Sequence, residues 1–588
     1  MEYQRRCRLL SGRERRPDGL AADLYSLRTT LVTLRGEGVE VATVLLDVAK
    51  SVTSKAATTV RSLWVMKRAG LVGRPDEGIR SLLTMHKYGP FAGVLAVGAR
   101  KNPHAVALVD EAGPLTYTEL DRRSNALARA WAERGVGPGT VIGALCRDHR
   151  GLVTVMAASG KAGAKLLLLN TGFGKQQLAD VMRREGAVKL VYDQEFTRLL
   201  EAVDGDVERY LAWADDPAAV PDGVLDMEQL IAETSADPMP TPPRPGSFIL
   251  LTSGTTGTPK GAPREKTSPI ASAQFLDRIP LRPQQSMFMA APAFHGTGLA
   301  QLLLALALGN KVVMRRRFDA EATLRAVAEH RCHVLVVVPT MLQRILDLPA
   351  DVRRRYDTSS LEIIFSAGSA IPVDVVERTF DTFGDVLYNL YGSTEVAVAT
   401  VATPDELRRD PRTAGRPPVG CSVRIYDHHG KPITEPGKVG RIFVGSILSF
   451  KGYTGGANKE VVDGLLATGD MGYFDESGQL FVVGRDDDMI VSGGENVYPL
   501  EVENLLSSRP DVLEAAVVGV DDEEFGQRLR AYVVLADGHP GDEAKADELR
   551  RYVKDNLARY KVPRDVIFLD ELPRNATGKL LRKQLAAR

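Results

Sequence analysis

Short apolar runs alternate with longer amphipathic stretches along most of the chain. The runs at 105–109, 141–145 and 166–169 are rich in Val, Leu and Ala, which is typical of buried strands. Between them the apolar residues recur with a helical period, and the stretch that begins at Leu115 has Thr118 as its expected N-cap. Strands that alternate with helices predict a parallel sheet with helices on both faces.

A further strand-like run at 248–251 leads directly into a loop of small and polar residues, LTSGTTGTPKGA, at 251–262. Glycines let the backbone turn tightly and bring its N–H groups close to an anion. Hydroxyls and a lysine add groups that suit phosphate oxygens. The residues concerned are Ser253, Gly254, Thr255, Thr256, Gly257, Thr258, Lys260 and Gly261. The loop therefore predicts a phosphate-binding site.

Two other interpretations of this loop are weaker. The nucleotide pattern G-x-x-x-x-G-K-[ST] does not fit, because Gly254 and Gly257 are too close and no Ser or Thr follows Lys260. A flexible linker would need neither a strand before it nor Pro259 and Gly261 around the lysine. The Pro-rich segment 215–246 does resemble a connection, and we expect it to cross the surface of one large domain.

Residues 1–80 differ from the rest of the chain. The segment 48–75 carries six basic residues and no acidic one, and apolar residues from Val44 to Trp64 recur at helical spacing. An amphipathic helix with a basic face would suit the surface of an anionic membrane. A helix packed on the main domain with a solvated basic face fits the same pattern, and we favour it slightly.

Composition excludes several classes of function. A chain of 588 residues with 44% hydrophobic and 26% charged residues indicates a soluble protein of two to four folding units. The formal net charge of +0 argues against bulk nucleic-acid binding. We expect a cytoplasmic protein, because the N-terminus lacks a signal-peptide pattern and the apolar run 298–308 is too short to span a bilayer. Neither a zinc site nor a disulfide framework is indicated by the spacing of Cys7, Cys146, Cys332 and Cys421.

Four later segments carry candidate chemistry. AAPAFHGTGLAQ at 290–301 places His295 beside glycines that leave room for a ligand, and IIFSAGSAIP at 363–372 is a strand that enters a turn of small residues. LYNLYGSTEV at 387–396 offers an aromatic ring, a hydroxyl and the carboxylate of Glu395, which suits Mg²⁺. Asp470 and Arg485 are suited to a sugar with vicinal hydroxyls.

The glycine-rich loop, followed downstream by the Y-G-x-T-E pattern at 391–395, resembles the signature of the adenylate-forming superfamily. This superfamily contains acyl-CoA synthetases, peptide-synthetase adenylation domains and firefly luciferase. The resemblance spans about 101–583 with the motifs in family order. It implies an α/β fold, with a large N-terminal domain of layered α/β sheets and a smaller, mobile α+β C-terminal domain. We therefore expect an N-terminal extension at 1–80, an adenylation domain at 81–486 and a C-terminal domain at 487–588.

The resemblance also implies a role for particular residues. ATP or AMP is expected to contact Thr252, Ser253, Gly254, Thr255, Thr256, Gly257, Lys260, Gly368, Ser369, Ala370, Asn389, Tyr391, Gly392, Asp470 and Arg485. The expected catalytic residues are Lys579, Glu395 and Thr394, with Glu395 and Thr256 as Mg²⁺ ligands. The acid pocket is expected at His295 and Gly296, the hinge at Asp487 and the CoA tunnel at Gly493 and Gly494.

These roles imply an ATP-dependent acid–thiol ligase that uses ATP, Mg²⁺ and CoA. The segment around His295 has no aspartate to pair with an amino acid's ammonium group, which favours an apolar acid. We expect a medium- to long-chain fatty acid. A fatty-acyl-AMP ligase that loads a carrier protein, a CoA ligase for another apolar acid and a non-catalytic binding protein are the alternatives. The expected partners are the acid, ATP and CoA. Nucleic acid is not an expected partner. Peripheral contact with the inner face of the membrane stays an open alternative.

Overall fold

The computed structural model describes residues 57–588, apart from 73–74, 217–219, 221–222, 253–258, 265–268, 451, 455, 457, 493–494, 523–525, 537, 576–578 and 588. The chain divides into two compact units, Met1–Arg61 and Ser62–Arg588. The predicted membrane-binding helix lies mostly outside the described residues. Within the second unit, Val65 and Met66 are buried, and the Arg68 guanidinium donates to the carbonyl oxygens of Leu276 and Asp277. The start of this unit therefore packs on the main domain.

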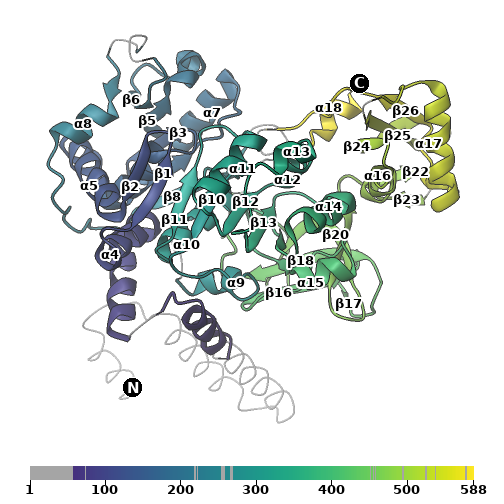
Figure 1. Cartoon of the computed structure of the whole chain (residues 1–588), viewed down its shortest axis with the longest axis horizontal. Helices are drawn as coiled ribbons and strands as arrows, with labels where there is room; N and C mark the ends of the chain where they lie inside the picture. The colour runs from purple at the N-terminus through teal and green to yellow at the C-terminus, as the bar shows by residue number, and fades with distance from the viewer. Residues whose placement is uncertain are drawn as a thin grey trace, which may run out of the picture. The chain divides into compact units, whose positions relative to one another are not determined.

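An eight-stranded sheet forms the centre of the large domain (Figure 1). Its inner strands are parallel, and only the edge pairs β1–β2 and β14–β15 are antiparallel. In spatial order the strands are β15 (Thr400–Ala402), β14 (Leu387–Tyr391), β13 (Ile363–Ala367), β12 (Val334–Val337), β10 (Ser286–Met289), β11 (Lys311–Met314), β1 (Val106–Asp110) and β2 (Gly113–Thr116).

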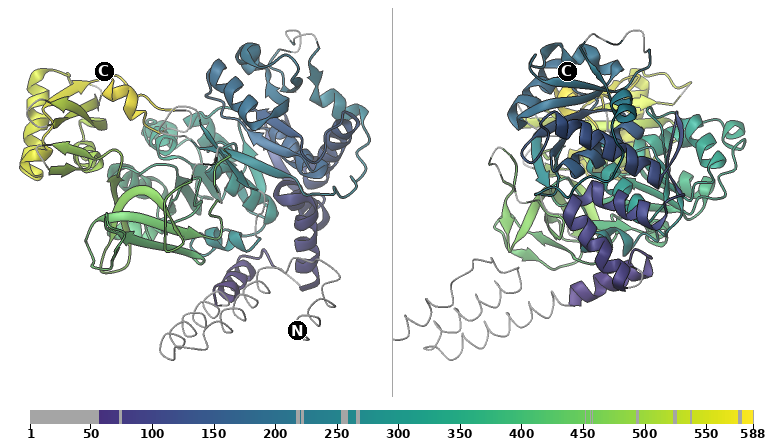
Figure 2. Two further views of the ribbon diagram at one scale, coloured as in Figure 1. Left: turned by 180° about the vertical axis from the view of Figure 1, so that it is seen from behind. Right: turned by 90° about the vertical axis from the view of Figure 1, so that its left-hand side faces the viewer.

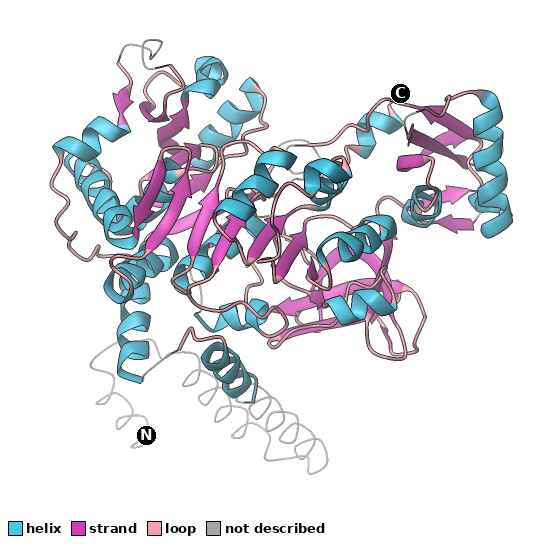
Figure 3. Ribbon diagram, in the orientation of Figure 1, coloured by secondary structure: helices cyan, strands magenta, loops and turns pink. Residues whose placement is uncertain are grey.

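Helices lie on both sides of this sheet (Figure 3), as the alternation of strands and helices predicts. Ile363 and Phe365 of β13 face one apolar core, whereas Ile364 faces another, because successive strand residues point to opposite faces. The helices that follow the strands are α9 (Ala273–Leu276), α10 (Gly296–Ala307), α11 (Ala320–Glu329), α12 (Pro339–Leu346), α13 (Ala350–Arg353), α14 (Val373–Phe383) and α15 (Pro404–Arg409).

A second sheet of seven strands is parallel except for its last pair. Its order is β7 (Leu225–Asp226), β6 (Glu208–Trp213), β5 (Ala187–Asp193), β3 (Val141–Leu145), β4 (Lys165–Leu168), β8 (Ser247–Thr252) and β9 (Lys260–Arg264). It packs with α4 (Pro75–Lys101), α5 (Tyr117–Glu133), α6 (Arg150–Ala162), α7 (Lys175–Glu185) and α8 (Met227–Glu233). One apolar core joins α4, α6 and α10 and so links the two sheets.

Two local expectations were wrong. Thr118 does not cap a helix, because the run from Leu115 first ends strand β2; Thr116 is the N-cap of α5, in a capping box with Glu119. The segment 215–246 is more than a connection, since it contains β7 and α8, where Asp226 caps the helix through hydrogen bonds to backbone N–H groups.

Two smaller sheets complete the chain. An antiparallel sheet contains β16 (Cys421–Tyr426), β17 (Pro432–Ile433), β18 (Gly440–Ser446), β19 (Val461–Val462), β20 (Leu465–Phe474) and β21 (Leu480–Arg485). The C-terminal sheet contains β22 (Ile490–Ser492), β23 (Glu495–Val497), β24 (Val512–Asp522), β25 (Gly526–Leu535) and β26 (Asp565–Phe568), with α16 (Pro499–Ser507), α17 (Glu543–Asn556) and α18 (Arg582–Ala586). Figure 2 gives two further views of this yellow α+β segment. The layered α/β fold with a smaller α+β C-terminal part is thus confirmed.

None of the helices in the described part of the chain combines the length and the apolar character that a membrane crossing requires.

Candidate functional site

The two strands that flank the glycine-rich loop, β8 and β9, pair with each other in antiparallel register. Strand β8 ends at Thr252 and β9 begins at Lys260, and these two residues are paired in the antiparallel register. The predicted strand before the loop is therefore confirmed, and the element after the loop is a strand. Ser253, Gly254, Thr255, Thr256, Gly257 and Thr258 lie outside the described residues, so their contacts with phosphate stay predictions.

Lys260 and Glu395 meet through one aromatic side chain, Tyr453. The Lys260 ammonium lies 5.4 Å from the centre of the Tyr453 ring, within the range of a cation–π contact. The Tyr453 hydroxyl donates a hydrogen bond to Glu395 Oε1. The next residue, Thr454, donates its backbone N–H to the Gly261 carbonyl oxygen at 3.0 Å. The hairpin and the Y-G-x-T-E segment, far apart in sequence, are thus held together.

Glu395 is kept ionised in a partly buried position. Burial alone would raise its pKa, but hydrogen bonds from Tyr453 and Ser393 outweigh that effect and hold the pKa below its usual value. A carboxylate that remains charged at neutral pH is a suitable oxygen ligand for Mg²⁺. Glu395 therefore fits the predicted metal role, whereas the second predicted ligand, Thr256, is outside the described residues.

Arg264 links β9 to the same region through hydrogen bonds. From β9 its guanidinium donates to the carbonyl oxygens of Thr394 and Leu448. Burial lowers the pKa of Arg264 to about 10, and the nearby Glu395 charge opposes this shift. Arg264 therefore remains a cation at neutral pH. It connects the hairpin, the Y-G-x-T-E segment and the chain that leads to Tyr453.

The predicted ribose residues also converge. Asp470 and Arg485 are opposite each other in the β20–β21 pair, with 3.5 Å between Asp470 Oδ1 and the guanidinium. The Tyr391 hydroxyl donates to Asp470 Oδ2 at 2.5 Å, and burial raises the pKa of Tyr391, which keeps that proton in place. A cavity of about 120 Å³ adjoins this pair. It is lined by Asp470, Val482, Gly484, Arg485, Asp488, Pro499, Leu500 and Arg582.

The predicted adenine residues lie at the ends of two neighbouring strands. Gly368 has φ of +108°, which a glycine adopts without strain, and it begins an exposed turn with Ser369 and Ala370 after β13. In the adjacent strand β14, the buried Oδ1 atom of Asn389 has no hydrogen-bond partner. An unpaired buried acceptor suits the amino group of adenine. The residues present therefore fit a bound adenine nucleotide.

Gly392 follows β14 where the backbone is closely packed. A Cβ atom at this position would lie 2.1 Å from the carbonyl oxygen of Ala397, so no larger residue fits without movement of the chain. The glycine thus sets the path of the backbone between Tyr391 and Thr394.

The predicted acid pocket begins at the N-terminus of α10. His295 is the N-cap residue, and burial lowers its pKa to about 4, so the imidazole is neutral at physiological pH. Gly296 is the first helical residue. The preceding loop is anchored by Asp148, whose Oδ1 accepts the Ala293 backbone N–H at 3.0 Å. Burial raises the pKa of this aspartate to about 7.

The C-terminal candidates are only partly described. Asp487 is bonded to the Arg485 guanidinium at 2.7 Å, beside the predicted hinge. Lys579 is exposed, and in the described part of the chain its hydrogen bonds stay in its own loop, with Asn575. Gly493 and Gly494 lie outside the described residues. The hinge, the tunnel and the delivery of Lys579 to the nucleotide therefore stay predictions, as do the domain boundaries.

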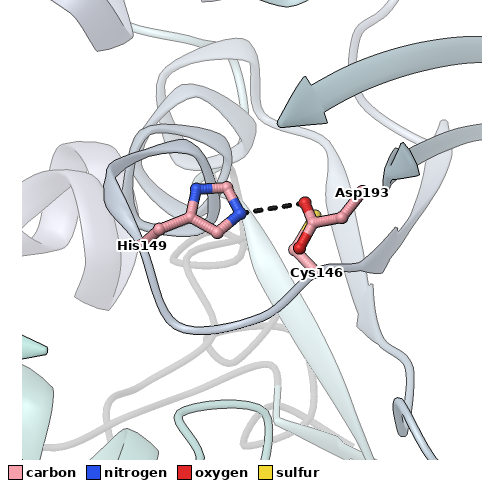
Figure 4. A group of neighbouring side chains, drawn as sticks. All are labelled: Cys146, His149 and Asp193. Carbon is pink, nitrogen blue, oxygen red and sulfur yellow. Dashed lines mark hydrogen bonds and ion pairs between the residues drawn. The ribbon is translucent and has the colours of Figure 1, made fainter. Parts of the chain in front are cut away.

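Cys146, His149 and Asp193 form a buried group that resembles a metal site (Figure 4). Both ring nitrogens of the histidine are already used: Nδ1 accepts the Gly151 N–H at 3.0 Å, and Nε2 lies 2.9 Å from Asp193 Oδ1. Burial and the Asp193 charge raise the pKa of the Cys146 thiol well above its usual value. The group therefore caps α6 and ties it to β5, and it offers no free nitrogen or thiolate to a metal.

Sequence reasoning missed several residues that build the site. Tyr453 lies within the span 101–583 that resembles the superfamily, but the sequence assigned it no role. Arg264 and Asp148 act through contacts with residues more than 100 positions away, and no local pattern marks them. A glycine-rich loop motif can be recognised along the chain, whereas such contacts follow only from the fold.

Comparison with known proteins identifies the family. Residues 95–454 match the AMP-binding enzyme family, and residues 501–579 match the AMP-binding enzyme C-terminal domain. The chain is 34% identical to a feruloyl-CoA synthase of Amycolatopsis sp. over 505 residues, which cover 83% of this chain and 97% of the relative. It is 30% identical to a fatty acid–[acyl-carrier-protein] ligase of Streptomyces coeruleorubidus, covering 83% of this chain and 94% of that protein.

The fold is also similar to solved structures of related enzymes. The o-succinylbenzoate CoA synthetase of Bacillus subtilis, in complex with its acyl-adenylate intermediate, matches with a TM-score of 0.71 and 29% identity, covering 84% of this chain and 97% of that one. Because the family match covers more than half of the sequence, the chain belongs to the AMP-binding enzyme family of adenylate-forming acid–CoA ligases, which use ATP, Mg²⁺ and CoA.

Proposed function

We propose that the protein is an AMP-forming CoA ligase for an apolar carboxylic acid that carries an aromatic ring. The convergence of Lys260, Glu395 and the Asp470–Arg485 pair supports the adenylation chemistry. The aromatic class is supported by the relatives, since feruloyl-CoA synthase and o-succinylbenzoate CoA synthetase are named for aromatic acids. A fatty acid, which the sequence led us to expect, has weaker support, from the fatty acid–[acyl-carrier-protein] ligase at 30% identity.

The reaction has two steps. A carboxylate oxygen of the acid attacks the α-phosphorus of ATP, and the bond to pyrophosphate breaks, which gives a mixed anhydride of the acid with AMP. The sulfur of CoA then attacks the acyl carbon, AMP leaves with the electrons of the broken C–O bond, and the thiol proton passes to solvent. Phosphoryl transfer of this kind needs alignment and charge neutralisation more than covalent participation of the protein.

We assign the residues to these needs as follows. Asp470 and Arg485 would hold the ribose, and Asn389 would accept a hydrogen bond from the base. Glu395 would hold Mg²⁺, which supplies charge neutralisation at the phosphates. Lys260 and the mobile Lys579 would add positive charge, and the neutral His295 would lie beside the acid without attracting its carboxylate away from the phosphate.

An assay of AMP formation with a panel of acids tests the proposal. Ferulic acid, cinnamic acid, decanoic acid and phenylalanine are each supplied with ATP, Mg²⁺ and CoA. We expect kcat/KM for the two arylpropenoic acids to exceed that for decanoic acid at least tenfold, and no turnover of phenylalanine. A preference for decanoic acid would contradict the aromatic assignment. Replacing CoA by a holo-carrier protein separates the two acceptors, because a carrier-loading ligase would leave free CoA unused.

A further inference from the structure

The carboxamide of Gln301 is buried in α10 without any hydrogen bond. The residue is 0% exposed, and neither Oε1 nor Nε2 has a partner. Among the residues that the structure describes, no other buried side chain has two unpaired polar atoms. Buried amides in native proteins are almost always paired, because an unpaired one has lost its bonds to water without replacement. Such a group calls for a hydrogen-bonding partner that the described part of the chain does not supply.

Gln301 lies on the same helix as Gly296, which is part of the predicted acid pocket. It lies five residues beyond Gly296, which corresponds to about 7.5 Å along the helix axis. It shares a face of α10 with Gly298 and Ala305, three residues before and four residues after it. The Cβ position of Gly298 meets the carbonyl oxygen of Pro292, so this face packs against the loop that leads to His295.

A neighbouring side of α10 packs against other helices. Leu302 and Leu306 face Phe91 and Leu95 of α4 across a small apolar gap. At about 100° per residue, Leu302 and Leu306 lie about 100° and 140° around the helix from Gln301, whereas Gly298 lies about 60° from it. Gln301 therefore lies on the side of the helix that carries Gly298 and the pocket loop.

We infer that Gln301 is a specificity-determining residue that binds a hydrogen-bonding substituent, such as a hydroxyl or carbonyl group, on the far end of the acid. The inference rests on the proposed function, because it takes the acid to enter beside His295 and extend along α10. A distance of about 7.5 Å suits an aromatic ring joined to the carboxylate by a two-carbon chain. A carboxamide can donate and accept at once, so it recognises a hydroxyl in either role.

Replacement of Gln301 by Met tests the inference, because Met keeps the length of the side chain and removes both polar atoms. The probes are 4-hydroxycinnamic acid and cinnamic acid, which differ only in the ring hydroxyl. We expect the ratio of kcat/KM for the hydroxylated acid to that for the plain acid to fall at least tenfold in Gln301→Met. The thermal midpoint of the protein without acid should be unchanged or higher, since an unpaired buried amide is removed.

Gln274→Met is the matched control. Gln274 is also 0% exposed, but both ends of its carboxamide are paired, with the Gly420 carbonyl oxygen at 3.0 Å and the Ser446 hydroxyl at 3.1 Å. This variant should lower the thermal midpoint, because its partners lose their bonds, and it should leave the ratio of the two acids unchanged.

The outcomes distinguish a wrong proposed function from a wrong role for Gln301. If the wild-type protein activates neither acid, the proposed function is wrong and the inference falls with it. If it activates both and Gln301→Met leaves their ratio unchanged, the inference alone is wrong. A loss of stability in Gln301→Met as large as that in Gln274→Met would show that a trapped water already satisfies the carboxamide, and this result would also overturn the inference.

Discussion

Replacing Arg264 by Met should separate activity from stability. The guanidinium is kept charged in a partly buried position, where its pKa is lowered from 12.5 to about 10. A shift of this size corresponds to roughly 3 kcal/mol of unfavourable burial. The two hydrogen bonds to the carbonyl oxygens of Thr394 and Leu448, each worth about 1.5–3 kcal/mol, offset that cost. We therefore expect the unfolding free energy of Arg264→Met to change by no more than about 2 kcal/mol.

The effect on the first half-reaction should be much larger. Without the Arg264 hydrogen bonds, the peptide between Thr394 and Glu395 loses its fixed orientation, and a displacement of about 1 Å at a reacting group costs about 100-fold in rate. Pyrophosphate release from acid and ATP should fall by about 10- to 100-fold. Thioester formation from a supplied acyl-adenylate and CoA should change less than about threefold, because no phosphate bond is made or broken.

Arg278→Met is a suitable control, because Arg278 also bonds a backbone carbonyl, that of Val401, and a carboxylate, that of Glu406. It should alter stability without a selective loss of adenylation. Equal losses of both half-reactions in Arg264→Met, or no loss in either, would refute the positioning role of Arg264.

Three further results are expected. Lys579→Ala should abolish adenylate formation and spare thioester formation from supplied acyl-adenylate; equal loss of both would remove the two-state account of the C-terminal domain. Asp470→Asn should raise KM for ATP more than tenfold with little change in KM for the acid, since Asp470 bonds Tyr391 and Arg485 and not the acid pocket. The pKa of Asp148 is about 7 in the folded state and near 4 in the unfolded state. The unfolding free energy of the wild type should therefore decrease as the pH rises from about 4 to about 7. Asp148→Asn should match the wild type near pH 4 and exceed it by up to about 4 kcal/mol at pH 8 in denaturant titrations, and parallel curves would contradict this assignment.

The sequence predicted those parts of the fold that depend on local patterns. Strands β1, β3, β4 and β8 follow from short apolar runs, and the structure contains them. The motif residues Tyr391, Asp470 and Arg485 were also found to meet, because glycines and charged residues at fixed spacing carry a local signal.

What could not be predicted depends on contacts between distant segments. Thr116 caps α5 because strand β2 ends there, and that strand exists only through its pairing with β1. Arg264 and Gln301 resemble ordinary surface and helix residues in the sequence; burial against other segments gives them their roles. The local sequence does not show which residues a side chain will contact after folding.

The hairpin that carries the phosphate loop has a consequence for product release. In many nucleotide-binding proteins a helix N-terminus points permanently at the phosphates. Here a strand, β9, starts at Lys260, so the backbone after the loop supplies no helix dipole. Besides Mg²⁺ at Glu395, the positive charge is then expected from side chains such as Lys260, and a side chain can turn away after pyrophosphate has formed. A pocket built in this way can hold a polyanion firmly for one step and then let pyrophosphate escape.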